Sequence, residues 1–249
     1  MLGVHGPDGV FGIGRQRVRH IAAAAFEPRV VLLGFHHEAQ KFFGCIRVLG
    51  VFEDHLIEEQ MVIDVTSQAK AMLIRFENGW TMYSHNQLYG RWTVNKVTTE
   101  SKMRRTLRAE FCTDKHAVRL WSATDIDLIP TAEEPLHSFL SRLGPDVLHE
   151  NVDEEVLYNQ LKSKKCFRKK GATLMLDQRS FAGLGNYLRS EILFAANIHP
   201  DDRPCDLSDT VLRNWAQAIK QVTVQAYETG GVTVPSDVAK AGKQRGEPR

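Results

Sequence analysis

The sequence predicts an α+β protein in which an antiparallel β domain precedes a helical domain. Three observations support this fold class. Short β-prone runs separated by turn residues occupy residues 61–122, apolar residues at helical spacing begin after Pro135, and no apolar run approaches the length of a membrane span. A chain of 249 residues is long enough for two modest domains.

Strands are predicted at 61–65, 71–76 and 80–84, where β-branched and aromatic residues are frequent. Asn78-Gly79 stands between the second and third runs, and this pair is a strong hairpin signal. Further strands are predicted at 91–97, 106–112 and 116–122, the last two joined by a turn at Asp114. These runs make an antiparallel β domain that ends near Pro130.

Helical spacing takes over after Pro135. Leu136, Phe139, Leu140 and Leu143 recur on one face and stop at Gly144-Pro145. Further helices are predicted to open at Asp153, to run over 190–196, and to run over 208–228 with Asp206 or Ser208 as N-cap. The tail from Gly230 is rich in Gly, Pro and Lys and is expected to fray.

Residues 1–51 show neither alternation nor a sustained helical period, and glycines crowd their start. The pattern improves at Phe52. We therefore predict four regions: a poorly patterned N-terminus over 1–51, the β domain over 52–134, the helical domain over 135–230, and a tail over 231–249.

Composition and charge limit the classes of protein that the chain can belong to. The net charge of +2 is too small to indicate nucleic acid by itself, so any such argument depends on where the charges lie. No signal peptide is recognisable, and we expect a cytoplasmic protein without a membrane partner. Cys45, Cys112, Cys166 and Cys205 form no C-x-x-C pair, which predicts reduced thiols and no zinc ribbon or redox motif.

Two neighbouring segments of the helical domain could hold a phosphate. Six basic residues without an acid fall within one short stretch: Lys162, Lys164, Lys165, Arg168, Lys169 and Lys170. Gly183-Leu184-Gly185-Asn186 then precedes a helix, and such a turn lets backbone N–H groups approach an anion. A solvated basic face and a tight interhelical connection explain the same residues without a ligand.

Two segments of the β domain could also carry function. The run from Tyr83 to Gly90 places Gln87, Leu88 and Tyr89 together, a mixture suited to filling the space of an extruded base. Lys70 precedes an apolar strand, where partial desolvation would make it a proton donor or an amine nucleophile. The alternatives are that Leu88 and Tyr89 belong to the core and that Lys70 is a surface charge.

Taken together, these segments resemble the formamidopyrimidine-DNA glycosylase and endonuclease VIII family. The matching runs begin at Gln68, Tyr83, Gly144, Leu176 and Ala195, and their order and spacing agree over roughly residues 52–230. The run Ser-His-Asn-Gln-Leu-Tyr-Gly at 84–90 favours the endonuclease VIII branch.

The resemblance implies a β-sandwich joined to a helix–two-turn–helix domain, with damaged double-stranded DNA as partner and a monomeric protein. It implies base-excision repair, in which oxidised pyrimidines are removed and the abasic strand is cut by β,δ-elimination. Lys70 then corresponds to the catalytic lysine. The DNA-binding residues it implies are Gln87, Leu88, Tyr89, Arg142, Lys169, Gly183, Gly185 and Asn186.

The two ends depart from the family pattern. The family begins Met-Pro-Glu-Gly-Pro-Glu, with the proline amine as nucleophile, whereas this chain begins Met1-Leu2-Gly3. No cysteine follows Cys205, so we expect neither the family's zinc ribbon nor any other cofactor or metal. We hypothesise that residues 1–51 come from a shifted reading frame or wrong start and that the C-terminus is truncated. A non-catalytic damaged-DNA-binding protein and a defective gene product are the alternatives to an active enzyme.

Overall fold

The computed structural model describes residues 45–48, 54–100, 103–113, 115–233 and 238. The chain divides into two compact units, residues 1–143 and 144–249, and each is described by itself. Predictions for residues 1–44 and for most of the tail lie outside the described residues.

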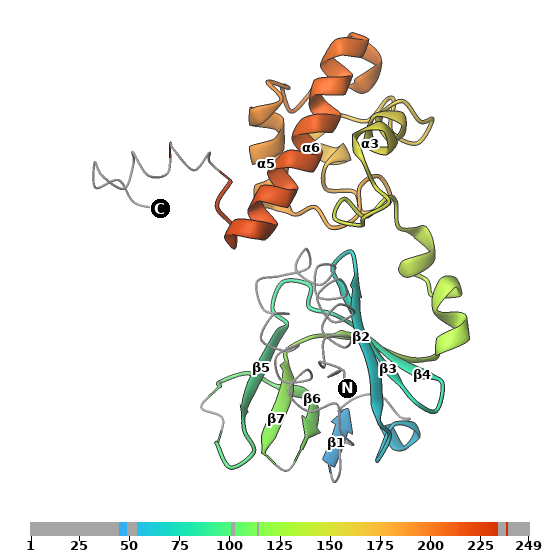
Figure 1. The fold of residues 1–249 in the computed structure, drawn as a ribbon, viewed down its shortest axis with the longest axis vertical. Helices are drawn as coiled ribbons and strands as arrows, with labels where there is room; N and C mark the ends of the chain where they lie inside the picture. The colour runs from blue at the N-terminus through green and yellow to red at the C-terminus, as the bar shows by residue number, and fades with distance from the viewer. Residues whose placement is uncertain (1–44, 49–53, 101–102, 114, 234–237, 239–249) are drawn as a thin grey trace, which may run out of the picture. The chain divides into compact units, whose positions relative to one another are not determined.

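Among its described residues, the first unit contains two four-stranded antiparallel sheets (Figure 1). One has the order β1-β6-β7-β5 and consists of β1 (Cys45–Val48), β6 (Leu107–Cys112), β7 (His116–Trp121) and β5 (Arg91–Lys96). The other has the order β2-β3-β4-β8 and consists of β2 (Val62–Gln68), β3 (Ala71–Phe76), β4 (Trp80–His85) and β8 (Asp125–Pro130). The six predicted strands are confirmed, and β1 and β8 are additional.

The inner faces of the two sheets share one apolar core, which makes the unit the predicted β-sandwich. Met72, Ile74 and Phe76 of β3 point into this core, as does Phe111 of the opposite sheet. The rings of Phe76 and Phe111 stack with centroids 6.4 Å apart, and Trp92 lies 6.2 Å from the same Phe111 ring. The predicted hairpin turn is present, with Gly79 at a φ of 83°.

The predicted helix over 136–143 is wrong. The chain instead forms two short 3-10 turns, η3 (Thr131–Leu136) and η4 (Leu140–Arg142), separated by His137 in an extended conformation with ψ 136°. The two turns follow the outer face of the β2-β3-β4-β8 sheet, where Leu140 is buried with Ala71, Leu73 and Tyr83. Packing against the sheet therefore overrides the helical spacing. The units consequently divide after Leu143, later than the boundary predicted at 134/135.

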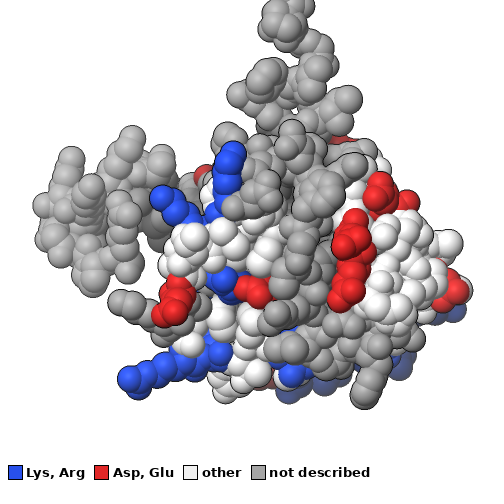
Figure 2. Space-filling model, turned by 90° about the horizontal axis from the view of Figure 1, so that it is seen from below, with Lys and Arg blue, Asp and Glu red and all other residues white. Residues whose placement is uncertain are grey.

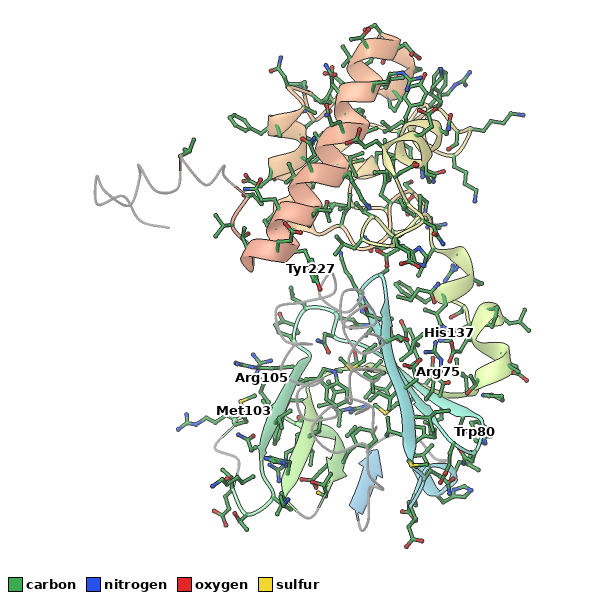
Figure 3. All side chains as sticks on the ribbon, viewed as in Figure 1. Arg75, Trp80, Met103, Arg105, His137 and Tyr227 are labelled. Carbon is green, nitrogen blue, oxygen red and sulfur yellow. The ribbon has the colours of Figure 1, made fainter. Side chains whose placement is uncertain are left out.

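Arg75 ties η3 to this sheet. Its guanidinium donates to both carboxylate oxygens of Glu134 in η3, at 2.8 and 2.6 Å, and to Asp64 and Thr66 of β2, each at 2.8 Å. The Thr81 hydroxyl donates to the same Glu134 carboxylate at 2.6 Å. Figure 3 shows Arg75 and His137 close to the place where the sheet meets the two turns.

The second unit is helical. It contains α3 (Glu154–Leu161), α4 (Gly171–Leu174), α5 (Asn186–Ala195), the 3-10 turn η5 (Pro204–Asp206) and α6 (Asp209–Thr229). Its core surrounds the fully buried Trp215 of α6. α3 opens at the predicted place, and Asp153 is its N-cap, since the Asp153 carboxylate accepts from the Val156 N–H at 2.8 Å. Ser208 stands at the N-cap of α6, as predicted, although its hydroxyl makes no capping hydrogen bond.

The other helices match the prediction in part. The helix expected over 190–196 begins four residues earlier, at Asn186, and α4 was not predicted. Gly230 ends α6 in the left-handed conformation, with φ 69°. Within the described residues, no helix has the length and apolarity that crossing a membrane requires.

Replacing Arg75 by Ala is expected to lower the free energy of unfolding of the first unit by about 2–3 kcal/mol, because two partly buried carboxylates lose their counter-charge. Urea denaturation followed by the fluorescence of Trp92 and Trp80 measures this change. Arg104→Ala, at an exposed arginine of the same unit, is the control and should cost less than about 0.5 kcal/mol. Equal effects of the two substitutions would contradict the tethering role of Arg75.

Candidate functional site

Lys70 occupies the tight turn of the β2–β3 hairpin. Gln68 pairs with Ala71 across the two strands, which leaves only Ala69 and Lys70 in the turn. Ala69 has a φ of 55°, a conformation that most non-glycine residues avoid, and its side chain is fully buried. The turn is therefore packed into the unit, and Lys70 is held at its rim in a half-buried position.

Burial lowers the pKa of the Lys70 ammonium below its ordinary value. Within the described part of the chain, this ammonium has neither a hydrogen bond nor an ion pair. The adjacent strand position is His85, which is opposite Ala71. Burial also lowers the pKa of His85, and the nearby charge of Lys70 lowers it further, although Asp125 opposes both effects. The hairpin thus presents an amine that gives up its proton more readily than an exposed lysine.

An aromatic and acidic cluster lies beside this hairpin. The Tyr83 hydroxyl donates to Asp125 at 3.2 Å, and the Tyr83 ring lies 4.2 Å from the ring of His137. Burial and the Asp125 carboxylate both raise the pKa of Tyr83, so this phenol stays protonated. His137 in turn pairs with Asp127 at 2.9 Å. The cluster packs on the outer side of β4, the strand that ends at His85.

The loop after β4 carries the three residues predicted to fill a gap in duplex DNA. Leu88 is 80% exposed and Tyr89 is 67% exposed, so the alternative that they belong to the core is wrong. Gln87 is also exposed and has a φ of 49°. The loop is closed by a hydrogen bond from the Gly90 N–H to the Asn86 carbonyl at 2.7 Å. Two large apolar side chains are thus held out into solvent, where they are available to a partner.

Arg142 ends η4 and is exposed. Its Nε donates to the Ser138 carbonyl, so the guanidinium is anchored by one edge. The structure places Arg142 in the first unit with Lys70 and the loop, which leaves Lys169, Gly183, Gly185 and Asn186 in the second unit.

In the second unit, a tight turn leads into α5. Gly183 has a φ of 91° and its N–H donates to the Gln178 side chain at 3.0 Å, while the amide nitrogen of Gln178 donates to the Leu184 carbonyl at 2.9 Å. Gly185 is the N-cap of α5 and provides no side-chain cap. Asn186 is exposed in the first turn of α5. Among the described residues, no side chain caps the first N–H groups of α5, and a helix N-terminus of this kind favours a negative charge.

The basic cluster is partly neutralised within the unit. Lys169 donates to Asp177 at 2.7 Å and to the Ser180 hydroxyl at 3.0 Å. Burial alone would raise the pKa of Asp177, but the hydrogen bonds from Lys169 and the Arg179 backbone hold it below its ordinary value. Lys162 and Lys170 also pair with carboxylates, of Asp209 and Asp201. Lys164, Lys165 and Arg168 are exposed, and no pairing of them occurs among the described residues.

Sequence reasoning passed over three residues around the gap-filling loop and turn. His85 accepts a hydrogen bond from the Gln87 N–H through Nδ1 at 3.1 Å, and Thr124 and Gln178 hold the loop and the turn by their side chains. His85 stands inside a recognised run, so its position was a usable signal. Thr124 lies far along the chain from Gln87, and no local pattern links the two.

The charge pattern of one face gives no further site. Figure 2 shows acidic side chains in a short row and basic side chains scattered on the face that it draws. The described residues of this face therefore form no continuous basic surface. Within the described ranges, no three His, Cys, Asp or Glu side chains come together as a metal site. The expectation that the chain binds no zinc stays a prediction.

Comparison with known proteins agrees with a β-sandwich unit followed by a helical unit. Residues 143–237 match the formamidopyrimidine-DNA glycosylase H2TH domain, where H2TH denotes helix–two-turn–helix. The chain is 40% identical over 172 residues to an Endonuclease 8 of Escherichia coli, a match that covers 69% of this chain and 65% of the relative. It is 39% identical over 183 residues to the Endonuclease 8 of Shigella dysenteriae, covering 74% of this chain and 69% of the relative.

Solved structures show the same fold at low sequence identity. The formamidopyrimidine-DNA glycosylase of Lactococcus lactis, bound non-covalently to DNA that contains an AP site, has a TM-score of 0.71 and 18% identity, covering 88% of this chain and 85% of that chain. MutM in complex with DNA that contains carbocyclic 8-oxo-G has a TM-score of 0.70 and 19% identity, covering 83% and 81%.

The β-sandwich and the match to the H2TH domain agree with the fold of these DNA glycosylases. The chain is a member of the formamidopyrimidine-DNA glycosylase and endonuclease VIII family. The chain spans about two-thirds of the length of its Endonuclease 8 relatives, 65% and 69% in the two matches above.

The lowered pKa of Lys70 predicts its reactivity. Because the neutral amine is the reactive form, acetylation of Lys70 by acetic anhydride should reach half its maximum at a lower pH than acetylation of Lys162. Hydrogen bonds from Lys162 to Tyr158 and Asp209 raise the pKa of Lys162, which makes it a useful internal comparison. Mass spectrometry of labelled peptides across a pH series measures both residues. The reverse order would show that Lys70 is not desolvated.

Proposed function

We propose that the chain acts in base-excision repair, as a DNA glycosylase for oxidised pyrimidines and as a lyase at abasic sites. The observation that carries the proposal is the half-buried Lys70 with its lowered pKa, in the same compact unit as the exposed loop of Gln87, Leu88 and Tyr89. The names of the relatives and the DNA in the similar structures support it. We further infer that the protein works as a cytoplasmic monomer without zinc.

The partner is damaged double-stranded DNA. A lesion base must leave the stack before its glycosidic bond can be reached, and the space that it leaves must be filled. Leu88 and Tyr89 offer the apolar and aromatic surface for that space, and Gln87 offers an amide to the base edge left unpaired. The turn before α5, with Asn186, holds a backbone phosphate, and Arg142 contributes a cationic contact.

Lys70 supplies the chemistry at the abasic site. In its neutral form, its Nζ adds to the C1′ aldehyde of the open sugar, and loss of water gives an imine. The protonated imine withdraws electrons, so that solvent water takes a C2′ proton and the 3′ phosphate leaves as the electron pair shifts. Hydrolysis of the imine then returns the lysine. The lowered pKa of Lys70 favours the neutral amine that this addition requires.

Borohydride trapping tests this step. With duplex DNA that contains an abasic site, the unsubstituted chain should give a covalent adduct, and Lys70→Ala should reduce the adduct yield by at least about a hundredfold, since the nucleophile is removed. Lys96→Ala, at an exposed lysine of the same unit, is the control and should leave the yield unchanged. An adduct that persists in Lys70→Ala would assign the chemistry to another amine.

A second candidate function is recognition of damage without cleavage. It is favoured by the exposed loop and the α5 turn, neither of which depends on Lys70. Tight binding of the same duplex without any adduct would favour this candidate over the enzyme. Neither binding nor adduct would favour the defective gene product.

Phosphate binding at the α5 turn makes a separate prediction. Asn186→Ala should weaken binding to duplex DNA by at least about tenfold, the loss expected for one hydrogen bond to a charged group. The slope of affinity against salt should stay the same, because Asn186 carries no charge. Asn214→Ala, at an exposed asparagine of α6, is the matched control. Fluorescence anisotropy across a salt series measures both quantities, and unchanged affinity in Asn186→Ala would remove the phosphate assignment.

A further inference from the structure

The loop that carries Leu88 and Tyr89 is fastened by two side chains from other parts of the first unit. The Thr124 hydroxyl, between β7 and β8, donates to the Gln87 side-chain carbonyl at 2.9 Å. The Arg105 guanidinium, in the segment that leads into β6, donates to the Tyr89 backbone carbonyl. Figure 3 labels Arg105 on this segment. One contact therefore holds each side of Leu88.

The loop backbone is strained and tightly folded. Gln87 has a φ of 49°, a conformation that persists in a non-glycine residue only where its surroundings enforce it. Its N–H is taken by His85 Nδ1 at 3.1 Å. A Cβ at Gly90 would lie 2.5 Å from the Asn86 Cα and 2.6 Å from the Asn86 carbonyl oxygen. The turn from Asn86 to Gly90 is thus as compact as a glycine permits.

Apolar packing does not hold this loop in place. Leu88 and Tyr89 at its tip are 80% and 67% exposed, so burial contributes little to its conformation. A short loop with two exposed apolar side chains would gain by folding them back onto the protein. The polar contacts from Thr124 and Arg105 oppose that collapse, because either contact is lost when the tip moves.

We propose that Thr124 and Arg105 are positioning residues of the Gln87–Leu88–Tyr89 loop. They keep its tip projecting into solvent, in the conformation that enters the duplex, before DNA binds. This inference rests on the proposed function, since it takes duplex DNA as the partner of the loop. Preorganisation of this kind lowers the entropic cost of binding without adding a contact to the ligand. Loss of this preorganisation should slow insertion of the loop and leave the contacts to phosphate unchanged.

The variants that test it remove one donor each and keep the size of the side chain. Thr124→Val removes the hydroxyl and Thr124→Ser restores it. Arg105→Met removes the guanidinium, and Arg104→Met, at the exposed neighbour, makes the same change in net charge without touching the loop. A general loss of positive charge therefore weakens DNA binding equally in the two arginine variants.

The first measurement uses the protein without DNA. Amide hydrogen exchange by NMR at Gln87 and Gly90 reports the two hydrogen bonds inside the loop. Thr124→Val and Arg105→Met should each speed this exchange about fivefold, the factor that corresponds to one hydrogen bond, and Thr124→Ser should restore the original rate. Unchanged exchange in both donor-free variants would overturn the inference whatever the DNA result.

The second measurement follows insertion of the loop into DNA. A duplex carrying a tetrahydrofuran abasic analogue opposite 2-aminopurine brightens as the loop displaces the reporter base. Each donor-free variant should insert about fivefold more slowly, and the double variant more slowly still. The salt slope should be unchanged in Thr124→Val, and in Arg105→Met it should equal that of Arg104→Met. An unchanged insertion rate in the double variant would overturn this inference and leave the proposed function standing. Absence of duplex binding by the unsubstituted chain would overturn the proposed function and, with it, this inference.

Discussion

Burial of the β2-β3-β4-β8 sheet on both faces is the constraint on which the first unit depends. The inner face packs on the second sheet around Phe76 and Phe111, and the outer face is covered by η3 and η4. Strand β3 consequently sends apolar side chains in both directions. Covering the outer face requires the two turns to stay in place, and the ion pair between Arg75 and Glu134 secures the first of them.

This double burial gives the β2–β3 hairpin its chemical character. A hairpin at the rim of a sheet with one wet face would leave its lysine fully hydrated. Here the turn residue before Lys70 is completely buried, and the charge of the half-buried amine lowers the pKa of His85, which is itself desolvated. The neighbouring loop shows the opposite arrangement, because its apolar tip is held out of the protein by polar contacts. A half-buried amine and an exposed apolar loop thus arise from the same sheet.

In the second unit, rigidity comes from side chains that close the turn before α5. Gln178 bonds to both sides of this turn, and Gly144 packs so closely that a Cβ there would lie 2.6 Å from the Ser180 carbonyl oxygen. The basic segment beside it offers fewer free charges than its composition suggests, because carboxylates within the unit neutralise three of its lysines. Attraction of an anion to the start of α5 would therefore depend on the oriented N–H groups of that turn and not only on the charge of the basic segment.

The sequence by itself determined the α+β class, six strands, the helices α3 and α6, and membership of the family, because each has a local pattern of spacing or an unbroken motif. It also singled out Lys70 and the loop of Gln87, Leu88 and Tyr89, whose roles stay predictions. Only the tertiary structure decided that 136–143 is not a helix, since the outer face of the sheet selects two short turns there. Strand β1 was missed because it forms by pairing with the distant strand β6. The proposed positioning residues Thr124 and Arg105 were missed for the same physical reason, because contacts between residues far apart in the chain leave no periodic pattern in the sequence.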